Sequence, residues 1–197
     1  MKHLRLLLPL SAALAACPSD PPVPSDDDDA ATAAPNPLLA VAQTGAFTLP
    51  CLTDAVHVLR TEYDYPHVYA TNDADMACAM AFVTARDRYF SMELARRLGL
   101  GTLSEVLGDL ALDADIENVA IGSRMVANRM YEAASPEMRA YWGAYAAGVN
   151  AYIAGVKEGR FAAPGEFEAA APFLGFADVT DLMLDWTDRD VAGMGAT

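Results

Sequence analysis

One uninterrupted helical segment constrains the fold of this chain more than any other feature. From Asp73 to Arg97 the sequence contains no proline and no glycine, and it is dominated by Ala, Met, Leu, Glu and Arg, which lose little side-chain freedom in a helix. This composition predicts a helix of about six turns. Large apolar residues at close to helical spacing predict one stripe that faces a core: Met76, Met80, Val83, Phe90 and Leu94.

The same segment carries a dense set of charges near its end. Glu93 precedes Arg96 by three positions and Arg97 by four, an order that favours ion pairs within a helix, each worth roughly 0.2–0.5 kcal/mol. The pattern by itself predicts an amphipathic core helix whose charged face is solvated.

Short signals before and after this helix predict its neighbours. Residues 56–59 and 67–70 alternate as strands around a turn at residues 63–66, which predicts a β-hairpin. Asn72, with Asp75 three positions later, predicts the helix N-cap. Downstream of two glycines, residues 103–107 predict a short helical turn.

The second half of the chain is predicted to be helical as well. Residues 115–133 can form a helix that Gly122 weakens, and Ser135-Pro136-Glu137 is a strong start signal for another, which stops at Gly155. That last helix carries a row of mostly aromatic side chains, which predicts a packing surface: Met138, Tyr141, Trp142, Tyr145, Val149, Tyr152 and Ile153.

The first seventeen residues have the organisation of an export signal. Lys2 and Arg5 precede an apolar run from Leu6 to Leu14 that is too short to span a bilayer. The ending Leu-Ala-Ala-Cys resembles a bacterial lipobox, which implies that residues 1–16 are a lipoprotein signal peptide and that Cys17 is the site of lipid attachment. We expect an exported protein, anchored by acyl chains at the periplasmic face of the cell envelope. The alternative is an ordinary cleaved signal that carries a cysteine after Ala-x-Ala.

Residues 17–46 are rich in Pro, Ala, Ser and Asp, with four consecutive aspartates at 26–29. Such a segment buries too little apolar surface to offset its ordering entropy, so it predicts a disordered tether. Flexible carboxylates also lack the preformed cage of a cation site. The folded region is therefore expected to be residues 47–197.

Two cysteines remain once Cys17 is assigned to lipid. In an oxidising compartment, Cys51 and Cys78 are a candidate disulfide. The bridge would close a loop of about 26 residues and stabilise the fold by roughly 3–4 kcal/mol. Two separate buried thiols are the alternative.

Charge and motifs exclude several classes of function. The net charge of −14 argues against a nucleic-acid partner, since phosphate binding needs clustered Lys and Arg. There is no G-x-S-x-G, H-E-x-x-H or Gly-rich phosphate loop. Residues 113–117 begin like a calcium loop, but Asn118 stands where glycine is required and Arg124 where the bidentate Glu should be. Ser104 is predicted to cap a helix and not to act as a nucleophile.

A series of short words in fixed order identifies a related family. The words are VHVLRTEYDYPHVYA (56–70), TND (71–73), AFVTARDRYFSMELARR (81–97), GTLSEVLG (101–108), YAAGVNAYI (145–153), FLGF (173–176) and WTDRD (186–190). The series resembles the N-terminal part of the α-subunit of the penicillin acylase family, large N-terminal-nucleophile amidohydrolases that include penicillin, cephalosporin and acyl-homoserine-lactone acylases. Within it, His67 is expected to make a structural hydrogen bond.

The chain departs from the family pattern at five positions of its best-matched words. Thr61 stands where the family usually has Asp, Asp64 and Ala81 where it has Gly, and Arg86 and Ser91 where it has Gln. Asp64 is tolerable in the turn, because Asp accepts left-handed backbone angles better than most residues. The changes indicate a divergent member or a copy under relaxed constraint.

The resemblance implies an α+β, mainly helical fold, with a short N-terminal β-hairpin followed by a bundle of helices. This would be an incomplete α-region, truncated at its C-terminus, of an N-terminal-nucleophile hydrolase (αββα) fold. In the family, an N-terminal serine attacks the carbonyl of a linear amide while its own α-amino group acts as general base. That serine lies far beyond residue 197, so this chain supplies no catalytic residue and is expected to be inactive alone.

The resemblance also implies a partner, the nucleophile-bearing β-subunit or a downstream segment of the same precursor. Calcium belongs to the complete family enzyme, and its ligands from this region would lie just past Thr197, so neither a cofactor nor a metal ligand is expected in this chain. The alternative reading is a non-catalytic envelope lipoprotein, or a decaying gene remnant, with only a binding role.

Overall fold

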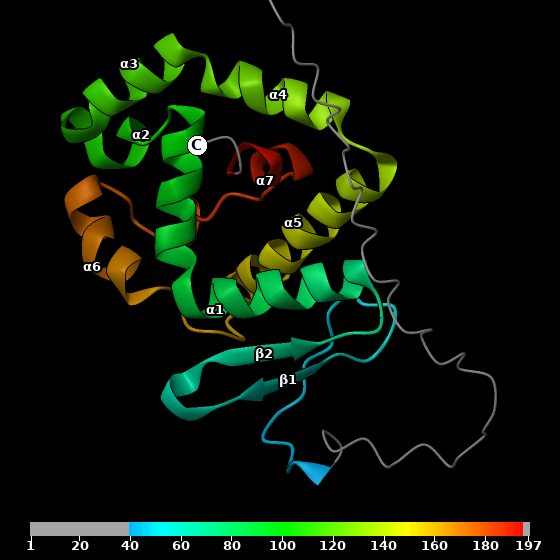
Figure 1. Cartoon of the computed structure of the whole chain (residues 1–197). Coiled ribbons are helices and arrows are strands. Elements are labelled where there is room, and N and C mark those ends of the chain that lie inside the picture. The colour runs from blue at the N-terminus through cyan, green and yellow to red at the C-terminus, as the bar shows by residue number, and fades with distance from the viewer. Residues whose placement is uncertain (1–39, 195–197) are drawn as a thin grey trace, which may run out of the picture.

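The computed structural model describes residues 40–194. The expected signal peptide, Cys17 and most of the expected tether lie outside the described residues. The described part is mainly helical with one two-stranded hairpin (Figure 1), which confirms the fold class. In chain order the elements are β1 (His57–Arg60), η2 (Glu62–Asp64), β2 (Pro66–Tyr69), α1 (Asp73–Leu100), α2 (Ser104–Leu107), η3 (Gly108–Ala111), α3 (Leu112–Ile121), α4 (Ser123–Ala133), α5 (Pro136–Lys157), α6 (Gly165–Leu174), η4 (Val179–Leu182) and α7 (Asp188–Met194).

The hairpin forms where the alternating pattern predicts it. Its strands are antiparallel, with Val58 opposite Val68. Asp64 takes a left-handed conformation in the turn (φ 62°), as its residue type allows. Thr61 Oγ1 and His67 Nε2 lie 3.2 Å apart, which confirms the expected structural hydrogen bond.

Helix α1 organises the fold and runs further than predicted. The Asn72 side chain accepts a hydrogen bond from the Asp75 N–H at 2.8 Å, which confirms the predicted N-cap. The helix bends sharply at Arg88, where φ is −146°, so Figure 1 shows two limbs that point in different directions. It ends at Gly101, whose left-handed backbone (φ 66°) stops the helix.

The predicted core stripe of α1 is mostly wrong. Of its members, Val83 is buried, Met80 is exposed, and the others are half-buried. The buried face consists mainly of small and aromatic residues: Ala77, Cys78, Ala79, Ala81, Phe82, Ala85, Tyr89 and Met92. The reason is that α5 approaches α1 closely. A Cβ at Gly148, which lies on α5, would overlap the carbonyl oxygen of Cys78. Small side chains let the two backbones meet, which a pattern of large apolar residues does not reveal.

The segment after α1 differs from the prediction in two ways. The expected helix over residues 115–133 is two helices, since Gly122 adopts φ 81° between them. Ser104 is the first residue of α2 and not its cap. The carboxylate of Asp115, from α3, accepts the N–H groups of Leu103 (2.9 Å) and Ser104 (2.6 Å) instead. A side chain distant in sequence therefore caps α2.

Helix α5 begins as its start signal predicts, with the Ser135 hydroxyl accepting the Met138 N–H at 3.2 Å. It continues past Gly155 to Lys157. Gly155 does not end the helix; it leaves room for the ring of Phe161, which a Cβ there would overlap.

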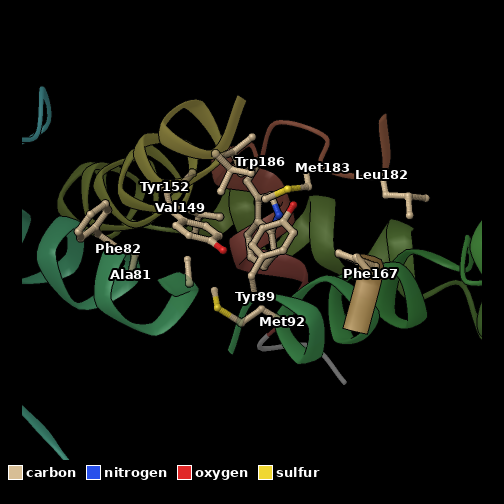
Figure 2. Close-up of a cluster of buried hydrophobic side chains, with 14 of the residues drawn as sticks. Ala81, Phe82, Tyr89, Met92, Val149, Tyr152, Phe167, Leu182, Met183 and Trp186 are labelled. Carbon is tan, nitrogen blue, oxygen red and sulfur yellow. The ribbon is translucent and has the colours of Figure 1, made fainter. Parts of the chain in front are cut away.

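The core lies between α1, α5, α6 and the segment that leads into α7 (Figure 2). Tyr89 from α1 packs against Tyr152 of α5 and Phe167 of α6, with ring centroids 5.7 and 6.1 Å apart. The predicted aromatic row of α5 is buried only in its second half, at Val149, Tyr152 and Ile153. None of the helices within residues 40–194 is long and apolar enough to cross a membrane.

Candidate functional site

A buried carboxylate lies at the centre of the C-terminal limb of α1. The side chain of Glu93 is fully enclosed, and it accepts hydrogen bonds from Arg96 Nε (2.8 Å) and Nη2 (2.6 Å) and from Arg97 Nε (2.8 Å). The spacing predicted these ion pairs correctly, but the expectation of a solvated face was wrong. Arg96 and Arg97 are only 7% and 4% exposed. A carboxylate is tolerated in such a place only when it is paired and hydrogen-bonded.

The charges continue into two other elements. Arg97 Nη1 lies 3.0 Å from Glu105 Oε2 on α2, and Arg96 Nη1 lies 3.8 Å from Asp190 Oδ1 on α7. Trp186 Nε1 donates to Glu93 Oε2 at 3.2 Å. The network therefore joins the end of α1 to α2 and to the segment that leads into α7. We call these five charged residues and Trp186 the Glu93 cluster.

The start of α7 is held from a second direction by α5. The Asn150 side-chain amide donates to the Trp186 carbonyl (2.9 Å) and its oxygen accepts the Trp186 N–H (2.8 Å). Thr187 and Asp190 then cap the helix reciprocally: Asp190 Oδ2 accepts the Thr187 N–H at 2.7 Å, and Thr187 Oγ1 accepts the Asp190 N–H at 3.2 Å. These hydrogen bonds hold the start of α7 against α5, and the Glu93 cluster holds it against α1.

The pKa values of two side chains in this region are raised by their surroundings. Burial works against the charged form of Arg96, but the hydrogen bonds and charge of Glu93 outweigh it and raise the pKa of Arg96. Burial, reinforced by the negative charge of Glu93, raises the pKa of Tyr89, so its phenol stays neutral. Such groups suit a structural and positioning role better than proton transfer near neutral pH.

A hydroxyl and an imidazole lie in contact on the exposed hairpin, those of Thr61 and His67. Within residues 40–194, no group of three His, Cys, Asp or Glu side chains is arranged to hold a metal ion.

Cys51 and Cys78 are joined by a disulfide, with Cα atoms 6.1 Å apart. The bridge attaches the segment before the hairpin to the buried face of α1. Asp75 holds the same segment, because its carboxylate accepts the N–H groups of Thr53 (2.8 Å) and Asp54 (2.9 Å) and the Thr53 hydroxyl (2.9 Å). These bonds, led by that from the Thr53 N–H, lower the pKa of Asp75 to about 2.

A groove lies beside the Glu93 cluster, under the arch that α3 and α4 form in Figure 1. It comprises two adjoining hollows of about 640 and 250 Å³ that share Leu100, Arg124 and Asn128. The remaining lining comes from α3, α4, the Gly101 turn and the start of α7: Gly101, Asn118, Val119, Gly122, Met125, Arg129, Glu132, Thr187, Arg189 and Asp190.

Helices α3 and α4 carry many exposed apolar side chains. Large side chains stand exposed along both helices and the turn before them: Leu110, Leu112, Ile116, Val119, Ile121, Met125, Val126 and Met130. Single exposed apolar residues are ordinary, but a run of this length on two consecutive helices is a candidate interaction surface. We call this run the α3–α4 apolar face.

Sequence reasoning missed three of the residues that build this region. Asn150 stands alone among apolar residues of α5. In the sequence, Asp115 is prominent only as the third position of an incomplete calcium loop, and Trp186 only as the first residue of the WTDRD word. Asn150 is the one of the three that the sequence could have revealed, because a lone polar residue in an apolar helical row must find a hydrogen-bond partner when it is buried.

Comparisons with known proteins agree on one family. The family model for penicillin amidase matches residues 55–196. Penicillin acylase 2 proenzyme of Pseudomonas sp. (strain SE83) is 41% identical over 111 residues, covering 56% of this chain and 14% of that protein. Acyl-homoserine lactone acylase QuiP of Pseudomonas syringae pv. syringae (strain B728a) is 34% identical over 110 residues, covering 56% of this chain and 13% of that protein.

A solved structure shows the same fold. A thermostable penicillin G acylase from Alcaligenes faecalis superposes with a TM-score of 0.54 and 28% sequence identity, covering 71% of this chain and 69% of that chain. The present chain spans only 13–14% of the length of the curated relatives named above. Sequence, fold and family model together show that the chain belongs to the penicillin amidase family.

Proposed function

We propose that this chain is one part of a penicillin-acylase-type hydrolase that cleaves carbon–nitrogen bonds of linear amides. The substrates would be acyl amides such as β-lactam antibiotics or acyl-homoserine lactones, the classes named by its relatives. The nucleophile would come from a β-subunit or a downstream segment, and the chain would be inactive alone. The observation that carries the proposal is the α3–α4 apolar face, a surface without a partner among residues 40–194 in a chain that matches a small share of its relatives.

The role of this chain in the reaction would be positional. Amide hydrolysis needs a nucleophile, a base and hydrogen-bond donors for the oxyanion. The described residues offer instead a rigid scaffold, in which the Glu93 cluster and Asn150 fix the start of α7. A scaffold of this kind would hold one wall of the acyl pocket against the partner. Any calcium ion of the assembled enzyme would be held by residues outside the described part of this chain.

The test is assembly in trans. The full chain is co-expressed with the penicillin acylase 2 proenzyme of Pseudomonas sp. from which the matching segment has been deleted, and the two are co-purified. The relative's own segment, supplied in the same way, is the positive control. We expect both segments to co-purify with the deleted proenzyme, and the full chain alone to hydrolyse no amide. If the control associates and this chain does not, the chain is a binding lipoprotein or a remnant and the proposal is wrong.

We also place the protein in the cell envelope, anchored through lipid on Cys17. Two features support this: the basic and apolar leader that ends in Leu-Ala-Ala-Cys, and the Cys51–Cys78 disulfide, a bond typical of oxidising compartments. Metabolic labelling with radioactive palmitate tests the anchor. We expect label in the natural chain and none in Cys17→Ala; equal labelling of the two would contradict the assignment.

A further inference from the structure

The groove under the α3–α4 arch carries positive charge on a protein that is strongly negative. Arg124, Arg129 and Arg189 line it together with only two carboxylates, Glu132 and Asp190, while the whole chain has a net charge of −14. Asp190 is already engaged, since it caps α7 and faces Arg96. The groove is therefore a local site of opposite sign to the rest of the protein.

Two of these arginines have no acidic partner among residues 40–194. Arg124 reaches only the Leu100 carbonyl, at 3.5 Å, and Arg129 makes no ion pair with any of those residues. Arg60, by comparison, pairs with Asp64 and Asp87. Guanidinium groups bind carboxylates through two parallel hydrogen bonds, so Arg124 and Arg129 are available for such a contact.

The groove is also continuous with the α3–α4 apolar face. Val119 and Met125 belong to both, and they are 68% and 51% exposed. A ligand that satisfies the arginines therefore meets apolar side chains at the same time. The lining extends over α3, α4 and the start of α7, which suits a length of polypeptide better than a compact small molecule. Nucleic acid is disfavoured by the repulsion of the remaining charges.

We propose that this groove docks an acidic segment of the nucleophile-bearing chain, with Asp or Glu side chains on Arg124 and Arg129 and aliphatic side chains on Val119 and Met125. The identity of the occupant rests on the proposed function. The chemistry of the groove does not, and it can be measured on this chain by itself.

The first experiment measures binding of a probe peptide to the full chain by fluorescence anisotropy. The probe is a short, fluorescein-labelled helical peptide with Glu and Leu on one face, and its matched control has Gln in place of every Glu. We expect the Glu peptide to bind at least about 10-fold more tightly than the Gln peptide, and added salt to reduce this difference. Equal affinities, or no binding of either peptide, would overturn the proposal.

Matched variants locate the contact. Arg124→Gln with Arg129→Gln should abolish the preference for the Glu peptide. Arg88→Gln, which removes an exposed arginine at the bend of α1 that lies outside the groove, should leave it unchanged. If both variants behave alike, the peptide binds elsewhere and the site is wrong.

Charge reversal then tests the occupant in the trans assembly. Arg124→Glu with Arg129→Glu should lower co-purification with the deleted proenzyme at least about 10-fold, while Arg88→Glu has no effect. If the charge-reversed variant co-purifies as well as the natural chain, the docking proposal is wrong and the proposed function is unaffected. Failure of the natural chain to assemble contradicts the proposed function, and the peptide measurement still decides whether the groove binds acidic segments.

Discussion

The indole N–H of Trp186 donates a hydrogen bond to the buried carboxylate of Glu93, across 93 positions of sequence. Through this contact the segment that leads into α7 packs on the C-terminal limb of α1, in the part of the core that Figure 2 shows. The same carboxylate neutralises two buried arginines. Glu93 therefore connects α1 to the segment that leads into α7.

Glu93→Gln should destabilise the chain strongly. The amide keeps the shape of the side chain but leaves Arg96 and Arg97 buried without their shared counter-charge, a change that costs about 3–5 kcal/mol. Urea unfolding followed by tryptophan fluorescence measures this loss. Glu117→Gln, on the exposed side of α3, is the control and should stay within about 0.5 kcal/mol of the parent. A similarly small effect of Glu93→Gln would mean that the cluster is not essential to the fold.

Gly148→Ala should separate α1 from α5. Its new Cβ would overlap the Cys78 carbonyl oxygen and lie 2.9 Å from the Ala81 Cβ, so we expect a loss of about 1–3 kcal/mol. Gly143→Ala is the matched control in the same helix, because nothing lies within 4 Å of its Cβ; it should stabilise by about 0.5–1 kcal/mol. Thermal melts give both values. Equal melting temperatures for the two variants would contradict the close helix contact.

Removal of the disulfide should weaken the attachment of the N-terminal segment. The bridge joins positions 27 apart, and on the chain-entropy model its loss costs about 3–4 kcal/mol. Cys51→Ala with Cys78→Ala should show this loss in urea unfolding. Peptide mapping without reductant should find the linked peptides in the parent. A double variant as stable as the parent would show that the bridge adds nothing.

Asp75 should make the fold sensitive to acid. Its pKa is lowered to about 2 from an ordinary 3.8, chiefly by the Thr53 N–H, so the unfolded chain binds the proton more readily than the folded one. The stability this supplies is complete above about pH 4 and is lost as the pH falls toward 2. Asp75→Asn should therefore melt below the parent at pH 7, with a gap that narrows from pH 4 to 2. A gap that does not change with pH would contradict this origin.

Local signals in the sequence predicted the elements, and contacts between distant segments decided what the elements bury. The hairpin, the Asn72 cap and the Ser135 start depend on neighbouring residues, and the structure confirms all three. The predicted core stripe of α1 is wrong because the buried face of α1 depends on Gly148, which lies on another helix. The predicted cap of α2 is wrong for the same reason, since the cap comes from Asp115 on α3.

In the candidate site, too, local spacing predicts some contacts, whereas packing between distant segments decides which groups are buried. The spacing of Glu93, Arg96 and Arg97 was sufficient to predict their ion pairs, because helical geometry alone brings them together. Their burial could not be predicted, since it requires Trp186 and the packing of α7 against α1. The arginine groove could not be predicted from the sequence, because its lining comes from four separate stretches of the chain.

The most direct measurement of the central claim is the rate of amine release from an acyl amide by the reconstituted pair. The full chain is combined with the deleted penicillin acylase 2 proenzyme, and each component is assayed alone beside the pair. The account predicts hydrolysis only when both are present, and a reduced rate with Glu93→Gln under conditions where that variant remains folded. Hydrolysis by this chain alone, or none by the pair when the relative's own segment restores activity, would contradict it.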